Sequence, residues 1–336
     1  MATQHSTTTY EAVRRGAGVF TRSDLGRIIV SGNDRASYLN GLLTNDIVGL
    51  KEGQGCYAAY LTAQGRMITD LHVYELGDAI LITLPLDVKD AVLAKLDQFI
   101  FSEDVKLGDV TDSFASVALI GPGAATTAER VLTIVGGAAL AALAEHGNLR
   151  ARFDGQPVIV LRITDTGEAG LELLADSAGV PALGAALRLA GAVDIVAPVA
   201  EVLRVEAGVP KFHRDMDEAT IPLEAGIENR AISLTKGCYV GQEVIIRVLH
   251  RGHGRIARRL VGLTLDGAAV PPAGTLVRSD AREIGRVTSA VASPALNRPI
   301  ALAYVQRDFT EAGTRVTVDG TDAVVTSLPF VGSSHE

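Results

Sequence analysis

The 336-residue sequence contains only two cysteines, Cys56 and Cys238, and no tryptophan. Two cysteines cannot form the disulfide framework of a small secreted domain. Neither belongs to a Cys-x-x-Cys pair or has a histidine at zinc-like spacing, so no stable metal site is expected. An iron–sulfur cluster generally needs four thiolates, so this chain could at most share a cluster with a partner or hold one briefly.

Long hydrophobic runs and an excess of basic charge are also missing. No stretch approaches the roughly 18 apolar residues that a membrane-spanning helix needs, so we expect no membrane partner. The first ten residues are polar and rich in threonine, without the apolar segment of a secretory signal, which predicts a cytoplasmic protein. The formal net charge of -8 disfavours general nucleic-acid binding.

Nucleotide-binding loops are absent as well: no Gly-x-Gly-x-x-Gly follows a predicted strand, and no Walker-type loop occurs. Helical and strand-like segments alternate without a strict β-α-β period, which favours an α+β body over a doubly wound sheet. The clearest segments are an antiparallel meander of strands at 57–61, 67–74 and 79–84, helices at 35–43 and 87–99, and alanine-rich helices at 124–135 and 138–145.

The last quarter of the chain has a different pattern. Six short strand-like runs are separated by Gly, Pro, Asp and Asn turns, at 260–265, 275–278, 284–290, 300–305, 315–318 and 323–328. This pattern predicts a small β-barrel. We therefore expect an α+β body over residues 10–252 and a barrel domain over 255–331, with the boundary near 252–254.

The octet Lys236-Gly237-Cys238-Tyr239-Val240-Gly241-Gln242-Glu243 concentrates reactive groups in a short segment. Apolar residues recur after it at helical spacing, so Cys238 is predicted to lie at or just before a helix N-terminus. The helix dipole and the Lys236 ammonium would both favour the thiolate, giving a nucleophile, a redox-active group or a transient metal ligand. The alternative is a small buried cysteine beside a glycine turn.

The octet resembles the K-G-C-[FY]-x-G-Q-E signature of the folate-binding YgfZ family, relatives of the T-protein (aminomethyltransferase) of the glycine cleavage system. Segments 38–47, 61–74, 203–226 and 285–305 are similar to family blocks in the same order. The resemblance implies two interleaved α+β domains and a C-terminal barrel around a central folate pocket, with tetrahydrofolate as cofactor.

The same resemblance implies an accessory protein that supports maturation or repair of iron–sulfur enzymes through Cys238, with those enzymes or assembly factors as partners. The alternative is a tetrahydrofolate-dependent aminomethyltransferase or demethylase. Lys236 and Tyr239 of the octet are candidate folate contacts, although Tyr239 is more typical of a packing residue. Asn45 and Asp46 could line the pocket or simply form a turn.

Glu206 is the leading candidate for a pterin ligand. Residues 203–208 suggest a strand in which Arg204 and Glu206 share a face, either as an ion pair or as ligands. One carboxylate can accept both the ring N–H and the exocyclic amine of a pterin. In the T-protein relatives, the glutamate of the matching block contacts the pterin, so the resemblance favours the ligand role for Glu206.

Asp70 is the candidate acid for one-carbon transfer. The methyltransferase relatives typically carry two adjacent aspartates at this point, and here Thr69 replaces the first of them. Losing a carboxylate commonly costs about 100-fold or more in rate, so the replacement predicts no efficient aminomethyl transfer unless Asp70 is the residue that matters.

A basic stretch at 247–259 could receive the anionic folate tail or be a solvated linker face.

Overall fold

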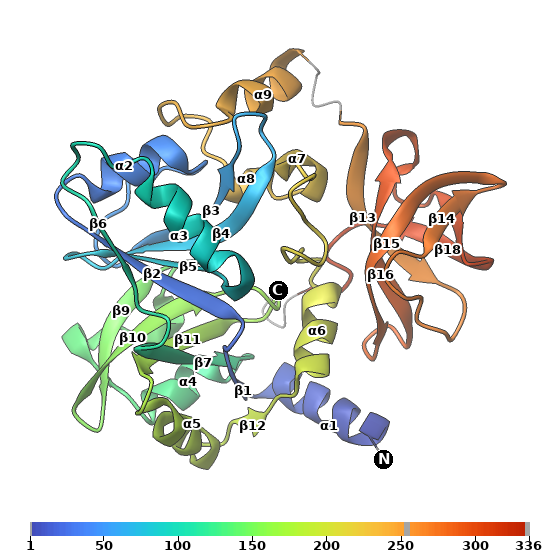
Figure 1. The fold of residues 1–336 in the computed structure, drawn as a ribbon. Helices are drawn as coiled ribbons and strands as arrows, with labels where there is room; N and C mark the ends of the chain where they lie inside the picture. Colours follow the sequence, from blue (N-terminus) through green and yellow to red (C-terminus); the bar gives the residue numbers. More distant parts are fainter. Residues whose placement is uncertain (1, 252–255, 333–336) are drawn as a thin grey trace.

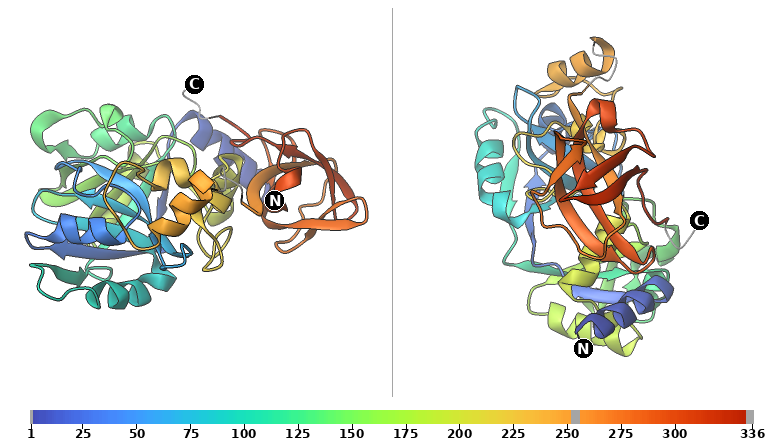
Figure 2. Two further views of the ribbon diagram at one scale, coloured as in Figure 1. Left: turned by 90° about the horizontal axis from the view of Figure 1, so that it is seen from above. Right: turned by 90° about the vertical axis from the view of Figure 1, so that its right-hand side faces the viewer.

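The computed structural model describes residues 2–251 and 256–332 and shows an α+β body beside a closed β-barrel (Figure 1). Figure 2 shows from two more directions that the barrel lies at one end of the molecule. The expected boundary at 252–254 falls outside the described residues. Within the described part of the chain, no helix is long and apolar enough to cross a membrane.

The first half of the body is a five-stranded sheet in the order β3-β4-β5-β2-β6. Its strands are β2 (Leu25–Ser31), β3 (Gly55–Leu61), β4 (Met67–Glu75), β5 (Ile80–Pro85) and β6 (Lys106–Asp109). The predicted meander is confirmed as β3, β4 and β5. The sheet shares one hydrophobic core with α2 (Arg35–Leu42), α3 (Lys89–Asp97), α7 (Pro222–Ala225), α8 (Glu228–Ala231) and α9 (Gln242–Ile246).

The second half is a seven-stranded sheet in the order β12-β1-β7-β11-β10-β9-β8. Its strands are β1 (Gly18–Thr21), β7 (Phe114–Ile120), β8 (Thr133–Ile134), β9 (Asn148–Phe153), β10 (Gln156–Ile163), β11 (Gly170–Asp176) and β12 (Val193–Asp194). Its helices are α1 (Ala2–Arg15), α4 (Ala124–Glu129), α5 (Val180–Leu189) and α6 (Ala197–Glu206). The chain visits this sheet at β1, leaves for the other sheet and returns at β7, so the predicted interleaving is confirmed.

Two predicted elements of the body are wrong, and a third, the helix predicted at 124–135, is too long: α4 ends at Glu129, and β8 (Thr133–Ile134) lies in the rest of that range. The run 203–208 is the end of helix α6 rather than a strand, since Pro198 opens a helix whose buried side includes Val199 and Leu203. The second alanine-rich helix, at 138–145, is absent: Gly136 and Gly137 both take positive φ, and only a short 3-10 turn follows. Ala138, Ala139 and Leu143 are themselves extended, so the alanine-rich run contains one turn only, although alanine favours a helix.

The C-terminal domain is a closed barrel with the strand order β13-β16-β15-β14-β17-β18. All six predicted strands are present, as β13 (Arg258–Leu265), β14 (Leu276–Ser279), β15 (Arg282–Ser293), β16 (Arg298–Gln306), β17 (Arg315–Val318) and β18 (Thr321–Thr326). Alternate side chains fill the barrel interior with valine, leucine and alanine. Helix α6 lies between this barrel and the body (Figure 1).

Glu206, the last residue of α6, joins three parts of the molecule. Its Oε2 accepts hydrogen bonds from Tyr10 (2.7 Å) and Arg14 (2.5 Å) of α1. Its Oε1 accepts one from Ser293 at the end of β15 (2.5 Å). Its main-chain oxygen accepts the amide of Phe330, at 2.8 Å, from the segment after the barrel. The carboxylate is fully buried, so these donors replace the water it would have when unfolded.

We expect Glu206→Gln to lower the free energy of unfolding by about 1.5–3 kcal/mol, because the ion pair with Arg14 is lost and an NH2 group replaces one of the two acceptor oxygens. Chemical denaturation monitored by circular dichroism measures the change. Glu201→Gln is the matched control: Glu201 lies on the same helix and also binds an arginine, but it is more exposed, so its loss should cost less. Equal losses in the two variants would contradict the joining role of Glu206.

Candidate functional site

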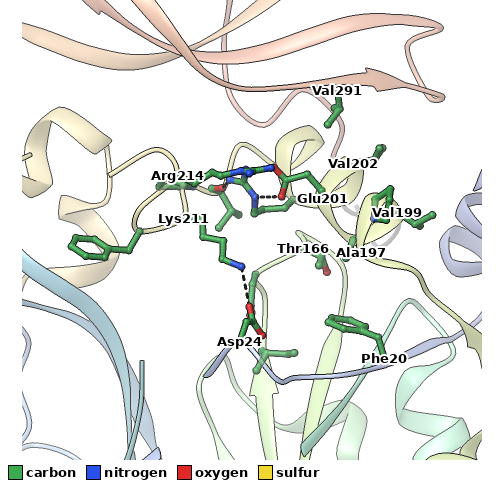
Figure 3. A pocket seen from close by; sticks show the side chains of 18 of the residues that line it. Phe20, Asp24, Thr166, Ala197, Val199, Glu201, Val202, Lys211, Arg214 and Val291 are labelled. Atoms are coloured by element: carbon green, nitrogen blue, oxygen red, sulfur yellow. Dashed lines mark hydrogen bonds and ion pairs between the residues drawn. The ribbon is translucent and has the colours of Figure 1, made fainter. Parts of the chain in front are cut away.

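A cavity of about 1760 Å³ lies where the two sheets of the body meet the barrel. Its wall takes residues from β4 and, as Figure 3 shows, from β1, α6, the loop after α6 and the barrel. The labelled residues Phe20, Lys211 and Val291 come from three of these separate segments. The volume exceeds the roughly 300–1,000 Å³ typical of small-molecule sites, so the cavity has room for a large ligand or for two reactants.

Strand β4 contributes Asp70, Leu71, His72 and Tyr74 to the cavity lining, whereas Thr69 is fully buried and does not line it. Alternation along the strand puts Thr69 on the face opposite Asp70, in line with the core residue Met67. The Thr69 hydroxyl donates to the main-chain oxygen of Asp70 at 2.8 Å. Any side chain at position 69 therefore points into the core of the five-stranded sheet, and the carboxylate that faces the cavity is that of Asp70.

The Asp70 carboxyl accepts a hydrogen bond from the hydroxyl of Tyr57, at 2.7 Å from Oδ2. Burial raises the pKa of Asp70 to about 6, although the Tyr57 hydrogen bond opposes this rise. Beside it, burial and the neighbouring His146 lower the pKa of His72 well below its usual range, so this imidazole is neutral at pH 7. The cavity wall thus carries a carboxyl that changes protonation near neutral pH.

The floor of the cavity is a paired charge cluster. Arg22 binds Asp165 at 2.7 Å and lies 3.8 Å from Glu172. Burial opposes ionisation of Asp165, but Arg22 holds the pKa of this carboxyl below its usual range. The other oxygen of Asp165, Oδ1, is buried and has no hydrogen-bond partner among the described residues. This Asp165 oxygen is therefore a hydrogen-bond acceptor that a ligand in the cavity could use.

The loop after α6 crosses one side of the cavity. Lys211 reaches Asp24, in the turn between β1 and β2, at 2.9 Å (Figure 3). His213 contacts Asp87 at 2.5 Å and Glu218 at 3.0 Å, and these carboxylates raise its pKa. The loop is thereby tied to the body through two ion pairs.

Of the two residues expected to hold the pterin, only Arg204 lines the cavity. It binds Glu201 and Asp215, both at 2.7 Å, and not Glu206, so the alternative of an Arg204–Glu206 ion pair is wrong. A helix turns successive residues by about 100°, so positions two apart do not share a face as they would in a strand. Glu206 itself is absent from the wall, and its Oε2 already accepts two donors.

Four further predicted contacts lie away from the cavity. The Lys236 ammonium donates to the main-chain oxygens of Asn40 (2.5 Å), Leu43 (2.6 Å) and Asn45 (3.0 Å), and burial lowers its pKa to about 8. Tyr239 packs in the core of the five-stranded sheet.

Asn45 and Asp46 form a turn: the Asp46 carboxylate accepts the amide of Gly49 at 3.0 Å. The Asn45 amide donates to the main-chain oxygens of Tyr57 at 2.8 Å and Arg230 at 3.0 Å. The turn alternative therefore describes this pair, and Asn45 has the further effect of fixing two residues of the cavity wall.

Cys238 is exposed, which excludes the buried alternative, but its surroundings differ from the prediction. Helix α9 begins only at Gln242 and has five residues, so the thiol is not at its N-terminus. Gly241 has φ +84°, and a Cβ there would lie 2.5 Å from the main-chain oxygen of Thr62. This glycine is thus required where the octet meets the β3–β4 turn.

The basic stretch 247–259 is partly outside the described residues. Arg247 pairs with Glu243, Arg258 with Glu224 and Arg259 with Glu228. None of these arginines lines the cavity. Their charges are matched locally, as in the solvated-face alternative.

Sequence reasoning missed Tyr57, His72 and Asp165. The signal for the first two was present, because alternation along two paired strands puts Tyr57 opposite His72 and beside Asp70. The sequence around Asp165 did not indicate a site residue, because a turn with an aspartate is an ordinary connection between two strands. Among the described residues, no group of three or more His, Cys, Asp or Glu side chains could hold a metal ion.

Comparison with known proteins gives relatives along almost the whole chain. An aminomethyltransferase of Rubrobacter xylanophilus is 35% identical over 323 residues, covering 96% of this chain and 85% of the relative. An aminomethyltransferase of Streptomyces coelicolor is 32% identical and covers 95% and 87%. A putative chloroplastic transferase of Arabidopsis thaliana is 29% identical and covers 97% and 74%.

The fold also matches a solved structure. The glycine cleavage system aminomethyltransferase T of Bartonella henselae superposes with a TM-score of 0.86 at 24% identity, over 97% of this chain and 89% of that one. Residues 2–236 match the GCVT N-terminal domain, and residues 258–331 match the glycine cleavage T-protein C-terminal barrel domain. These matches confirm the predicted α+β body with a C-terminal barrel. The chain belongs to the glycine cleavage T-protein family.

Proposed function

We propose that this protein binds tetrahydrofolate in the central cavity and transfers a one-carbon unit to or from it, as a T-protein-like aminomethyltransferase or demethylase. The observation that carries the proposal is the Asp70 carboxyl on the cavity wall, with a pKa near 6. The family assignment agrees with the predicted cofactor, tetrahydrofolate. The names of the relatives favour the transferase over the accessory role.

The cavity wall suits a folate. Phe20, Tyr57 and Phe212 provide aromatic surface for a flat ring system, and the volume is ample for the ring and its tail. A pterin needs acceptors for its N–H groups, and Asp165 Oδ1 has no partner among the described residues. Glu206 would serve this role only if Tyr10 or Arg14 released its Oε2, so Asp165 is the better-placed acceptor.

Asp70 supplies the proton chemistry. Moving a one-carbon unit between amine nitrogens requires an N–H proton to leave one amine and another to be delivered to its partner. A carboxyl with a pKa near the working pH does both, because neither of its protonation states is strongly disfavoured. Tetrahydrofolate, when bound, supplies the amine that carries the carbon. The ionised carboxylate would also stabilise positive charge that develops on nitrogen.

The Thr69 replacement was the reason to expect no efficient transfer, and its position weakens that reason. Thr69 faces the core, whereas Asp70 faces the cavity. The chain therefore keeps the acid at the position where a ligand could meet it. This supports transfer catalysed by Asp70 alone.

We expect Asp70→Asn to reduce transfer by about 100-fold or more while folate affinity changes little, since the amide cannot move a proton. The measurement is production of methylene-tetrahydrofolate from aminomethyl donors, or of methyl-tetrahydrofolate from N-methyl donors, with folate binding followed by calorimetry. If ionised Asp70 is the base, activity in the parent should rise as the pH increases through about 6. Thr69→Val is the matched control and should keep most activity, because it changes the neighbour on the opposite face. A fully active Asp70→Asn variant would contradict the proposal.

A YgfZ-type accessory role in iron–sulfur enzyme maturation is the second candidate. The exposed thiol of Cys238 is the observation in its favour. The Lys236 ammonium is engaged by main-chain oxygens, so it gives this thiol no direct hydrogen bond in the structure. A single thiol leaves transient cluster ligation or mixed-disulfide exchange with a partner as the available chemistry.

The accessory role predicts that Cys238→Ser abolishes rescue of a strain deficient in iron–sulfur enzyme activity while folate affinity stays unchanged. Alkylation followed by mass spectrometry should modify Cys238 in the folded protein and leave the buried Cys56 unmodified until unfolding. Asp70→Asn is the internal control, because it should impair transfer and spare rescue. Full rescue by Cys238→Ser removes the thiol from the function.

A further inference from the structure

Tyr57 is held in one position from several sides. On β3 it pairs in register with His72 of β4, and the two rings lie 5.1 Å apart. The guanidinium of Arg230 lies over the ring, 5.6 Å from its centre. The Asn45 side chain binds the main-chain oxygens of both Tyr57 and Arg230. The phenol oxygen therefore has a fixed location, and it donates to Asp70 Oδ2 at 2.7 Å.

We propose that Tyr57 is a positioning residue for Asp70: its hydroxyl holds the carboxyl in one orientation toward the cavity and stabilises the ionised form. The inference rests on the proposed transfer function for its biological meaning. The coupling of the two side chains, in contrast, is measurable in the protein without substrate.

The charges around Asp70 show why this hydroxyl matters. Burial and Asp165, from the turn before β11, raise the pKa of Asp70, whereas Tyr57 and Lys211 lower it. His72 is neutral, as noted above, and Arg230 is engaged by Glu145 at 2.8 Å. Among the side chains facing the carboxyl, Tyr57 is the one that donates a hydrogen bond to it directly.

The phenol itself stays protonated. Burial and the neighbouring Asp70 carboxylate raise the pKa of Tyr57 well above its usual range. Tyr57 is therefore a permanent donor at neutral pH and cannot act as the base. Its contribution is to offset part of the burial effect, which keeps the pKa of Asp70 lower than it would be without the hydroxyl.

The test is Tyr57→Phe, which removes one oxygen and keeps the ring contacts with His72 and Arg230. The apparent pKa of Asp70, followed by ¹³C NMR of labelled aspartate carboxyls in the folate-free protein, should rise by about one unit or more. The pH at which kcat/KM reaches half its plateau should rise by the same amount, with little change in the KM for folate. Tyr74→Phe is the matched control, since Tyr74 also lines the cavity but has no hydrogen bond to Asp70.

The two readouts separate the inference from the function on which it rests. An unshifted Asp70 titration in folded Tyr57→Phe, or an equal shift in Tyr74→Phe, overturns the role of Tyr57 even if the parent catalyses transfer. A shifted titration in a protein that shows no transfer with any donor overturns the proposed function and leaves the coupling established. A shift in both the titration and the pH profile supports both.

Discussion

The buried carboxylate of Glu206 is the interaction on which the arrangement of the domains depends. Through its side chain it binds α1 and the end of β15, and through its main-chain oxygen it binds the segment that follows the barrel. A charge without water must be matched by donors, so these segments are held at fixed positions around the end of α6. The positions of the cavity walls that α6 and the barrel contribute are fixed by the same contacts.

The cavity that results is poor in free charge. Arg22 is paired with Asp165, Arg204 with Glu201 and Asp215, and Lys211 with Asp24. Asp70 differs, because its direct side-chain partner is the neutral phenol of Tyr57. A carboxyl next to a neutral donor keeps both protonation states accessible, whereas one beside a guanidinium remains ionised at neutral pH. Asp70 is therefore the carboxyl that can exchange a proton near neutral pH, because the other carboxylates named here are paired with arginine or lysine.

Much of the fold could be predicted from the sequence, because alternation and turn residues are local signals. They were sufficient for the meander, for all six barrel strands and for α2 and α3. The end of α6 was predicted as a strand because Leu203 to Gly208 fits both strand alternation and helical periodicity. Pro198, in the first turn of α6, is the residue that indicates a helix. The site was harder: Asp70 was predicted as the acid and lines the cavity, but its partner Tyr57 was missed although strand alternation puts the two side chains on one face. Lys236 bonds to residues almost 200 positions away, and a contact of this kind depends on tertiary packing and leaves no trace in spacing.

The cavity takes its walls from both sheets and the barrel, and this has a consequence for how the protein responds to occupancy. A ligand that contacts all the walls stabilises the assembled protein, because only the assembled sheets and barrel form the complete binding surface. Its binding energy is then shared by segments far apart in the chain, and each tenfold excess of free ligand over Kd adds about 1.4 kcal/mol to the stability of the whole assembly. The loaded protein should therefore melt as one cooperative unit.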